Sequence, residues 1–245
     1  MIVPNNGTIN ESSQGAGSAR AIDRDYLRHM FGTGWSPWGG EIADEGALGP
    51  FEGTTSKLSD ADIRAALDTR AGRSATRELH LLEEVRCWRG YVRADYMCFY
   101  QDTISIIEIK SDRDSLRRFQ EQARVYSAVA DRVALVVGWS LASHALRAAP
   151  CWWDVILAER DSEGGVRFAP LRDGTQNRHV TPGALVAMLP LDEVRRLARK
   201  AEERRPRSSV RELRQFVASS LSCTELRASV FDWLARLVSG RRDRA

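Results

Sequence analysis

The chain has 245 residues, of which 43% are hydrophobic and 28% are charged, and its formal net charge is +3. This composition allows one compact domain with a smaller appendage, and no stretch approaches the roughly 20 apolar residues of a membrane span. The first residues lack the charged start and apolar run of a secretory signal, so we expect a cytoplasmic protein with no membrane partner.

The N-terminal quarter differs from the rest of the chain. Residues 1–56 are predicted to form an irregular leader, because they are polar or glycine-rich over most of their length. After the leader, Ser59 is placed to cap a helix with the sequence DADIRAALDTR. A second helix is predicted from about Ala75 to Glu83.

Two strands joined by a tight turn are predicted between residues 93 and 110. The segments VRADYMCFY and TISIIEIK are rich in aromatic and β-branched residues, and a polar QD pair separates them. A two-residue turn, or a four-residue loop in the same register, pairs Tyr100 with Thr103. The same register then places Asp95 opposite Glu108.

This hairpin brings charged side chains together. Lys110 points to the same face as Glu108, because side chains two positions apart share one face of a strand. Two directly opposed carboxylates repel each other, so the pair favours a bound cation, and oxygen ligands suit a hard ion such as Mg²⁺. The alternative is a solvated pair of acids with Lys110 as their salt-bridge partner. Met97 and Ile106 lie on the same face as the acids, which indicates a covered surface.

The helix that follows carries a polar residue on its apolar stripe. Ser111 and Asp114 fit a helix-capping pattern after the hairpin. Gln122 interrupts the stripe formed by Phe119, Tyr126 and Val129. A helix packed over the hairpin would direct Gln122 at the acidic cluster, whereas a position at the edge of the stripe would direct it to solvent. Tyr126 is interpreted as a core residue.

The second half of the chain is predicted to add one strand, one helix and one hairpin, followed by helices. VALVVG is the strand, residues 142–147 are the helix, and CWWDVILAER pairs with VRFAPLRD around SEGG. The pattern is helical from Pro182 onward. We therefore divide the chain into the leader, a core over residues 57–181 and a helical extension over residues 182–245.

Charge is unevenly distributed between these parts. Residues 191–245 hold fourteen Arg or Lys and eight Asp or Glu, a balance of +6, which leaves −3 for the remainder. A basic tail beside an acidic core favours binding of a polyanion. The alternative is a solvated amphipathic bundle. In the dense segment RRLARKAEERRPR, the candidate phosphate contacts are Arg195, Arg196, Arg204 and Arg205.

Asp95, the E-x-K triplet of Glu108 and Lys110, and the helix after them resemble the PD-(D/E)XK nuclease superfamily. The phrase EIKSD, with Asp114, Arg118, Gln122 and Tyr126 in the following segment, is similar to one branch of it, a group of little-characterised bacterial proteins. The resemblance covers roughly residues 57–240. It implies an α/β fold with a restriction-endonuclease-like core, in which a mixed central sheet is flanked by helices in the order αβββαβ.

The resemblance also implies residue roles. Asp95 and Glu108 would bind Mg²⁺ or Mn²⁺, with Glu84 as a further ligand and Glu83 as its rival for that role. Lys110 and Gln122 would complete the catalytic set, and Arg118 joins the candidate nucleic-acid contacts. We expect metal-dependent hydrolysis of phosphodiester bonds in DNA, with RNA as a weaker possibility. A catalytically silent nucleic-acid-binding or assembly module is the alternative, and the oligomeric state stays open.

Overall fold

The computed structural model describes residues 57–74, 80–100, 103–201 and 209–242. The leader predicted over residues 1–56 lies outside them. Their centre is a six-stranded mixed sheet in the order β1-β2-β3-β4-β5-β6. The strands are β1 (His80–Cys87), β2 (Val92–Tyr100), β3 (Thr103–Lys110), β4 (Arg132–Gly138), β5 (Asp154–Arg160) and β6 (Val166–Arg172). The protein is therefore of the α/β class, as the sequence predicts.

The predicted hairpin is confirmed. β2 and β3 pair antiparallel, with Tyr100 opposite Thr103, and the ladder continues to Tyr96 opposite Ile107. β3 and β4 then run parallel, because the helix α3 (Phe119–Val129) crosses over between them. β4 and β5 are also parallel, and β5 and β6 form the second predicted hairpin.

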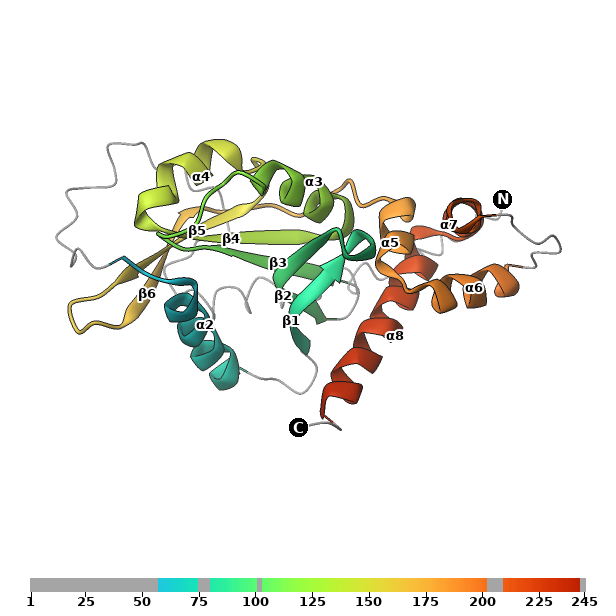
Figure 1. Cartoon of the computed structure of the whole chain (residues 1–245), viewed down its shortest axis with the longest axis horizontal. Helices are drawn as coiled ribbons and strands as arrows, with labels where there is room; N and C mark the ends of the chain where they lie inside the picture. The colour runs from blue at the N-terminus through green and yellow to red at the C-terminus, as the bar shows by residue number, and fades with distance from the viewer. Residues whose placement is uncertain (1–56, 75–79, 101–102, 202–208, 243–245) are drawn as a thin grey trace, which may run out of the picture.

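Helices cover both faces of the sheet (Figure 1). On one face, α2 (Asp60–Ser74) buries Ile63 and Leu67 against Ile107 and Val136 of the central strands. Ser59 caps this helix as predicted, since its hydroxyl lies 3.3 Å from the amide of Asp62. On the other face lie α3 and α4 (Ala142–Ala148).

The described part of the C-terminal extension contains four helices, which gather beside β1 (Figure 1). They are α5 (Pro182–Met188), α6 (Leu191–Lys200), α7 (Val210–Ser220) and α8 (Cys223–Arg242). Arg227 of α8 binds both carboxylate oxygens of the buried Asp131, at 2.5 and 2.6 Å. This contact joins the extension to the start of β4, so the extension and the sheet share one core.

A second polar contact ties the other end of the sheet together. The Asp112 carboxylate accepts hydrogen bonds from the amide of Leu58, just before α2, and from the amide of Ser140, just after β4. A Cβ atom at Gly138 would lie 2.6 Å from the Asp112 carboxylate and 2.7 Å from its backbone nitrogen. The close approach of these segments therefore requires glycine at position 138.

Two predicted helix positions are wrong. The helix predicted over Ala75–Glu83 is contradicted from residue 80, because His80–Cys87 is a strand, and residues 75–79 lie outside the described part of the chain. Leu82 and Val85 bury their side chains in the same cluster, at a helix-like spacing of three. The spacing arises because Glu84, with φ of 56°, interrupts the alternation of the strand. The second error concerns Ser111, whose contacts with Asp114 form a turn, while the helix begins at Phe119.

None of the helices that the structure describes is long and apolar enough to cross a membrane.

Candidate active site

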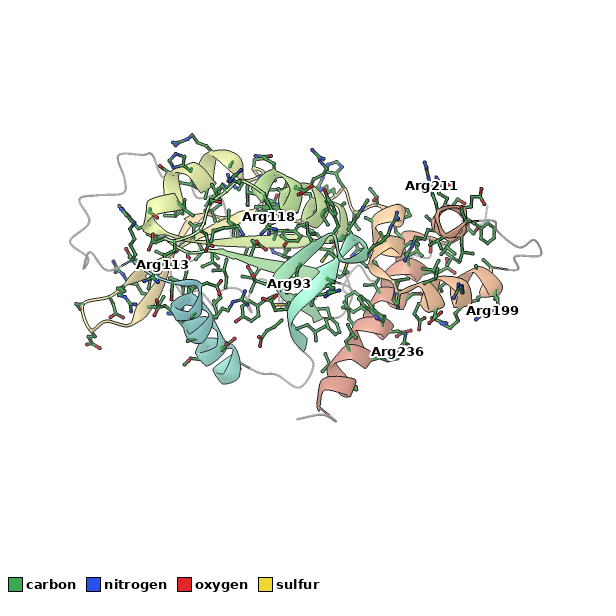
Figure 2. All side chains as sticks on the ribbon, in the orientation of Figure 1. Arg93, Arg113, Arg118, Arg199, Arg211 and Arg236 are labelled. Atoms are coloured by element: carbon green, nitrogen blue, oxygen red, sulfur yellow. The ribbon has the colours of Figure 1, made fainter. Side chains whose placement is uncertain are left out.

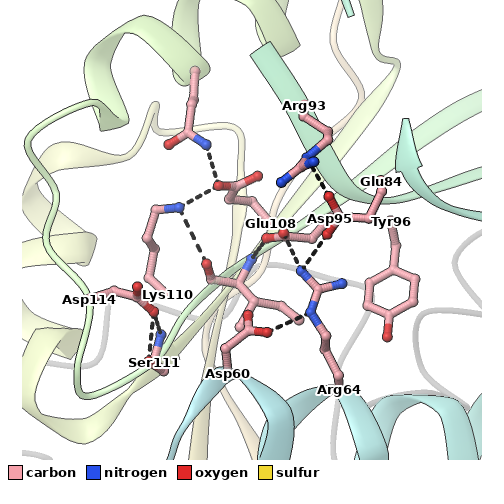
Figure 3. Close-up of polar contacts among 12 residues, drawn as sticks. Asp60, Arg64, Glu84, Arg93, Asp95, Tyr96, Glu108, Lys110, Ser111 and Asp114 are labelled. Carbon is pink, nitrogen blue, oxygen red and sulfur yellow. Dashed lines mark hydrogen bonds and ion pairs between the residues drawn. The ribbon is translucent and has the colours of Figure 1, made fainter. Parts of the chain in front are cut away.

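A pocket of about 500 Å³ opens where β2 and β3 separate. The carboxylates of Asp95 and Glu108 line it together with Lys110 and Gln122. These four residues come from β2, β3 and α3, and Figure 3 shows how the side chains of Asp95, Glu108 and Lys110 converge. The structure thus brings together all four residues that the sequence predicts as catalytic.

Glu108 is the most enclosed of the four, with 1% of its surface exposed. One of its carboxylate oxygens accepts hydrogen bonds from the Lys110 ammonium and from the Gln122 side-chain amide. The other oxygen accepts a hydrogen bond of 2.7 Å from the Tyr126 hydroxyl. α3 therefore directs Gln122 at the acidic cluster, which is one of the two directions that the sequence allows, and Tyr126 is both a core residue and a partner of the site.

The side chain of Asp95 forms a hydrogen bond with the backbone of β3. Its Oδ2 atom accepts a hydrogen bond of 2.7 Å from the amide of Ile109. The backbone ladder ends one residue earlier, at Tyr96 and Ile107, so the predicted opposition of Asp95 and Glu108 is not a ladder pair. β2 changes the side on which it buries residues at this point, since Ala94 and Met97 lie in one cluster. The two carboxylates still line one pocket.

Arg64 is a site residue that the sequence analysis missed. It rises from α2 to the Oδ1 atom of Asp95, and its guanidinium also lies 3.1 Å from Glu84 and 2.6 Å from Asp60 (Figure 3). Its side chain is only 20% exposed, and it lies over the ring of Tyr96. Sequence alone showed only an Arg four residues after an Asp on a helix, which is the spacing of an ordinary surface pair.

Glu84 does not join the other two acids as predicted. Its carboxylate binds Arg64 and Arg93, and it does not line the pocket. The described residues include no cluster of three or more His, Cys, Asp or Glu able to hold a metal ion. The rival residue Glu83 is exposed on β1. A backbone position with φ of 56° is costly for a glutamate, and such strain is concentrated at functional sites.

The two carboxylates share an environment that favours their neutral forms. Burial raises the pKa of Glu108, and the neighbouring charge of Asp95 raises it further, while Lys110 opposes both effects. Burial also raises the pKa of Asp95, while the Ile109 amide and Arg64 act in the opposite direction. A cation placed between these acids would therefore relieve a repulsion that the fold maintains.

The oxygen atoms at this point suit a hard cation. Asp95 and Glu108 supply carboxylates, and the carbonyl of Ile109 supplies a third oxygen. The Lys110 ammonium already contacts two of these groups, since it donates to Glu108 and lies 3.3 Å from the Ile109 carbonyl. A positive group is thus stable at this position, and the donor set fits Mg²⁺ or Mn²⁺ through two carboxylates and one carbonyl.

The candidate nucleic-acid contacts come from separate parts of the chain, and Figure 2 labels one of them, Arg118, beside the sheet. Arg118 is exposed, and it lines both the candidate active-site pocket and an adjoining pocket of about 520 Å³ that Arg117 also lines. Arg195 and Arg196 instead bind acids of their own helix, Asp192 at 3.1 Å and Glu193 at 2.7 Å. Arg204 and Arg205 lie outside the described residues.

Comparison with known proteins links most of the chain to one family. A family model described as bacteriophage P4 protein cII matches residues 56–242. One solved structure, the SPO1766 protein of unknown function from Silicibacter pomeroyi, matches with 22% identity over 54% of this chain and 87% of that chain, at a TM-score of 0.32. No curated protein matches. The family match covers the sheet, the pocket and the C-terminal helices.

Proposed function

The chain belongs to the bacteriophage P4 cII family, and we propose that it is a metal-dependent nuclease that hydrolyses phosphodiester bonds in DNA. The observation that carries this proposal is the convergence of Asp95, Glu108 and Lys110 in one pocket, with Gln122 bonded to the same carboxylate. Two acids beside a lysine form an arrangement suited to phosphate chemistry, because the acids hold a cation and the lysine faces the anionic substrate.

The proposal includes the fold family of the core. The order α2-β1-β2-β3-α3-β4 is the αβββαβ order expected of a PD-(D/E)XK nuclease. We therefore propose that residues 57–181 form a restriction-endonuclease-like core and that residues 182–245 form its helical extension. A cytoplasmic location belongs to the same proposal.

Each residue of the site has a proposed role. Mg²⁺ or Mn²⁺, when bound, would neutralise phosphate charge and make a water molecule more acidic. Asp95, Glu108 and the Ile109 carbonyl would hold that ion. Lys110 would donate to the phosphate oxygen on which negative charge develops. Gln122 keeps the Glu108 carboxylate in place through its hydrogen bond.

A cleavage assay tests the activity. The full chain would be incubated with labelled single-stranded, nicked and duplex DNA and with RNA, in Mg²⁺, Mn²⁺ or chelator. We expect cleavage of DNA that requires the metal. Cleavage of RNA alone would overturn the choice of DNA, and intact substrates in every metal-containing sample would overturn the nuclease proposal.

The variant Lys110→Ala tests the proposed role of this lysine in catalysis. Losing one donor to the developing charge is expected to cost about 2.7–4 kcal/mol of activation free energy, on the order of a 100- to 1,000-fold slower reaction. Metal binding should persist, because the two carboxylates remain. Gln122→Ala, which removes a neighbour of Glu108 rather than a proposed contact to the phosphate, should give a milder defect. A wild-type rate in Lys110→Ala would instead assign this lysine to a structural salt bridge.

The second candidate is a nucleic-acid-binding or assembly module that keeps the fold without catalysis. One observation favours it: each carboxylate oxygen of Asp95 and Glu108 already has a protein partner. A metal ion at this position would lie next to the cationic groups of Arg64 and Lys110, which repel it. Nucleic-acid binding without divalent-ion binding or cleavage would support this candidate over the nuclease.

A further inference from the structure

The turn between β1 and β2 lies at the rim of the active-site pocket and is strained. Trp88, Arg89 and Gly90 all have positive φ, at 48°, 61° and 87°. A glycine adopts this backbone region freely, whereas the two preceding residues do so at a cost. Trp88 packs against the hydrophobic core, so the turn is held in place from beneath. The strain is therefore maintained by tertiary packing.

This turn places an aromatic ring in solvent beside the candidate catalytic residues. Tyr91 is 65% exposed, and it lines the same pocket as Glu108 and Lys110. It also lines a neighbouring hollow of about 440 Å³ together with Trp88 and Arg89. Among the exposed large hydrophobic residues of the described chain, Tyr91 has the largest exposed fraction.

The ring is fixed at one end. The Tyr91 hydroxyl donates a hydrogen bond to the Glu121 carboxylate on α3, which also lines the pocket. The turn before β2 and the helix α3 therefore hold the two ends of the side chain, while 65% of the residue stays exposed. A fixed aromatic ring loses little conformational entropy when a flat ligand stacks on it.

Both acidic and cationic side chains line the pocket beside the ring, and the acids are Asp60, Asp95, Glu108, Asp114 and Glu121. The cations are Lys110 and the three exposed arginines Arg86, Arg93 and Arg118. An aromatic platform next to cations is the combination that binds single-stranded nucleic acid, because cations follow the phosphates and the ring stacks on a base. The pocket volume of about 500 Å³ lies in the range of small-molecule sites, roughly 300–1,000 Å³.

We propose that Tyr91 is a stacking site for an unpaired nucleobase next to the phosphate held at Lys110, so that the substrate is single-stranded or locally unpaired nucleic acid. The inference rests on the proposed function and narrows its substrate class. A base within a duplex is stacked on its neighbours along the strand, whereas an unpaired base can leave the stack and offer its face to Tyr91.

A binding experiment in chelator tests this site without any need for cleavage. A short oligonucleotide with one 2-aminopurine base, single-stranded or annealed to its complement, would be titrated with the full-length protein and its variants. Tyr91→Ala should weaken single-strand binding by about 5- to 150-fold, the range for loss of one stacked base. Duplex binding should change far less. Tyr91→Phe keeps the ring and loses only the hydroxyl, so it should restore most of the single-strand affinity.

The outcomes separate this inference from the nuclease proposal. Equal single-strand affinity of the wild type and Tyr91→Ala, or the same loss on duplex as on single strand, would overturn the stacking site even if the protein cleaves DNA. A loss confined to single strands would support it even if no cleavage occurs in any metal. Thermal melting of both variants identifies a global folding defect, and in that case Tyr91→Phe, which must quench 2-aminopurine fluorescence as the wild type does, decides the matter.

Discussion

Strand β3 donates a backbone hydrogen bond to an aspartate carboxylate near each of its two ends. The amide of Ile104, near the start of the strand, donates to Asp131 at 2.9 Å. The amide of Ile109, near its end, donates to Asp95 at 2.7 Å. Each aspartate also binds an arginine from a helix, Asp131 from α8 and Asp95 from α2. The same chemical unit thus occurs twice on one strand.

The two units differ in how completely the negative charge is balanced. Asp131 binds Arg227 through two hydrogen bonds. Asp95 shares Arg64 with two other acids and lies beside Glu108 in an open pocket. A carboxylate with its own arginine stabilises the fold, whereas one that shares its arginine next to another acid can accept a further cation. The structural unit at Asp131 and the candidate site at Asp95 therefore differ in how far the carboxylate charge is balanced and in whether a pocket reaches it.

The largest expected effect, a loss of cleavage, comes from changing the acids near the end of β3, where the pocket opens. Asp95→Asn and Glu108→Gln should each abolish detectable cleavage and weaken divalent-ion binding, because each removes a charged ligand. Both variants should fold, since the remaining hydrogen bonds and the core stay in place. Isothermal calorimetry with Mn²⁺, together with cleavage assays, measures the effect. Unchanged ion affinity in both variants would make the two ends of β3 equivalent and remove the basis for a metal site.

Changing Asp131, which pairs with Arg227 near the start of β3, should instead reduce the stability of the fold. Asp131→Ala leaves Arg227 without its two carboxylate bonds and the Ile104 amide without this acceptor. Breaking a buried ion pair costs about 3–5 kcal/mol, and the low end applies here because the Arg227 side chain is 19% exposed. Urea denaturation measures the loss. A loss below about 1 kcal/mol, the range of exposed pairs, would contradict the structural role of this unit.

The salt dependence of DNA affinity should change when arginines beside the pocket are replaced, but not when arginines of the extension are replaced. If Arg117 and Arg118 contact phosphates, changing both to Gln should lower the slope of log affinity against log salt by about 1.8 for duplex DNA, or somewhat less for single strands. The matched control changes Arg195 and Arg196, which bind acids of α6. A larger slope change in the control would indicate that the substrate binds to the extension and not to the pocket.

The smallest expected effect is a dependence of stability on pH. Burial raises the pKa of Glu108 and of Asp95 above their unfolded values, so the folded protein holds protons that the unfolded chain releases. These two groups therefore contribute most stability below the unfolded pKa values, and that contribution falls as pH rises through the raised values. In chelator, Glu108→Gln should show a flatter profile than the wild type in urea melts from about pH 4 to 8. Parallel profiles would contradict the raised pKa of Glu108.

Sequence reasoning recovered the parts of this protein that depend on local patterns. The hairpin and its register follow from two β-rich segments around a polar pair, and Ser59 follows from a capping pattern. The four predicted catalytic residues meet because one of these strands and the next helix carry most of them.

The errors arise where tertiary structure overrides a local pattern. The helix predicted over Ala75–Glu83 runs into the first half of β1, and nothing in the sequence reveals that Glu84 is a left-handed residue inside a strand. Arg64 was missed because its contact with Asp95 spans 31 positions and depends on how α2 packs under the sheet. Tyr126 was placed in the core correctly, but its hydroxyl partner Glu108 depends on the tilt of α3.

The close contact between Gly138 and Asp112 has a consequence for how this protein can evolve. Because a Cβ atom at position 138 would collide with the backbone and carboxylate of Asp112, a side chain at 138 and the present Asp112 contact exclude each other. Asp112 also holds the residue before α2, the helix that carries Arg64. A relative with any residue other than glycine at 138 must therefore fasten α2 by other means, and the two positions should vary together.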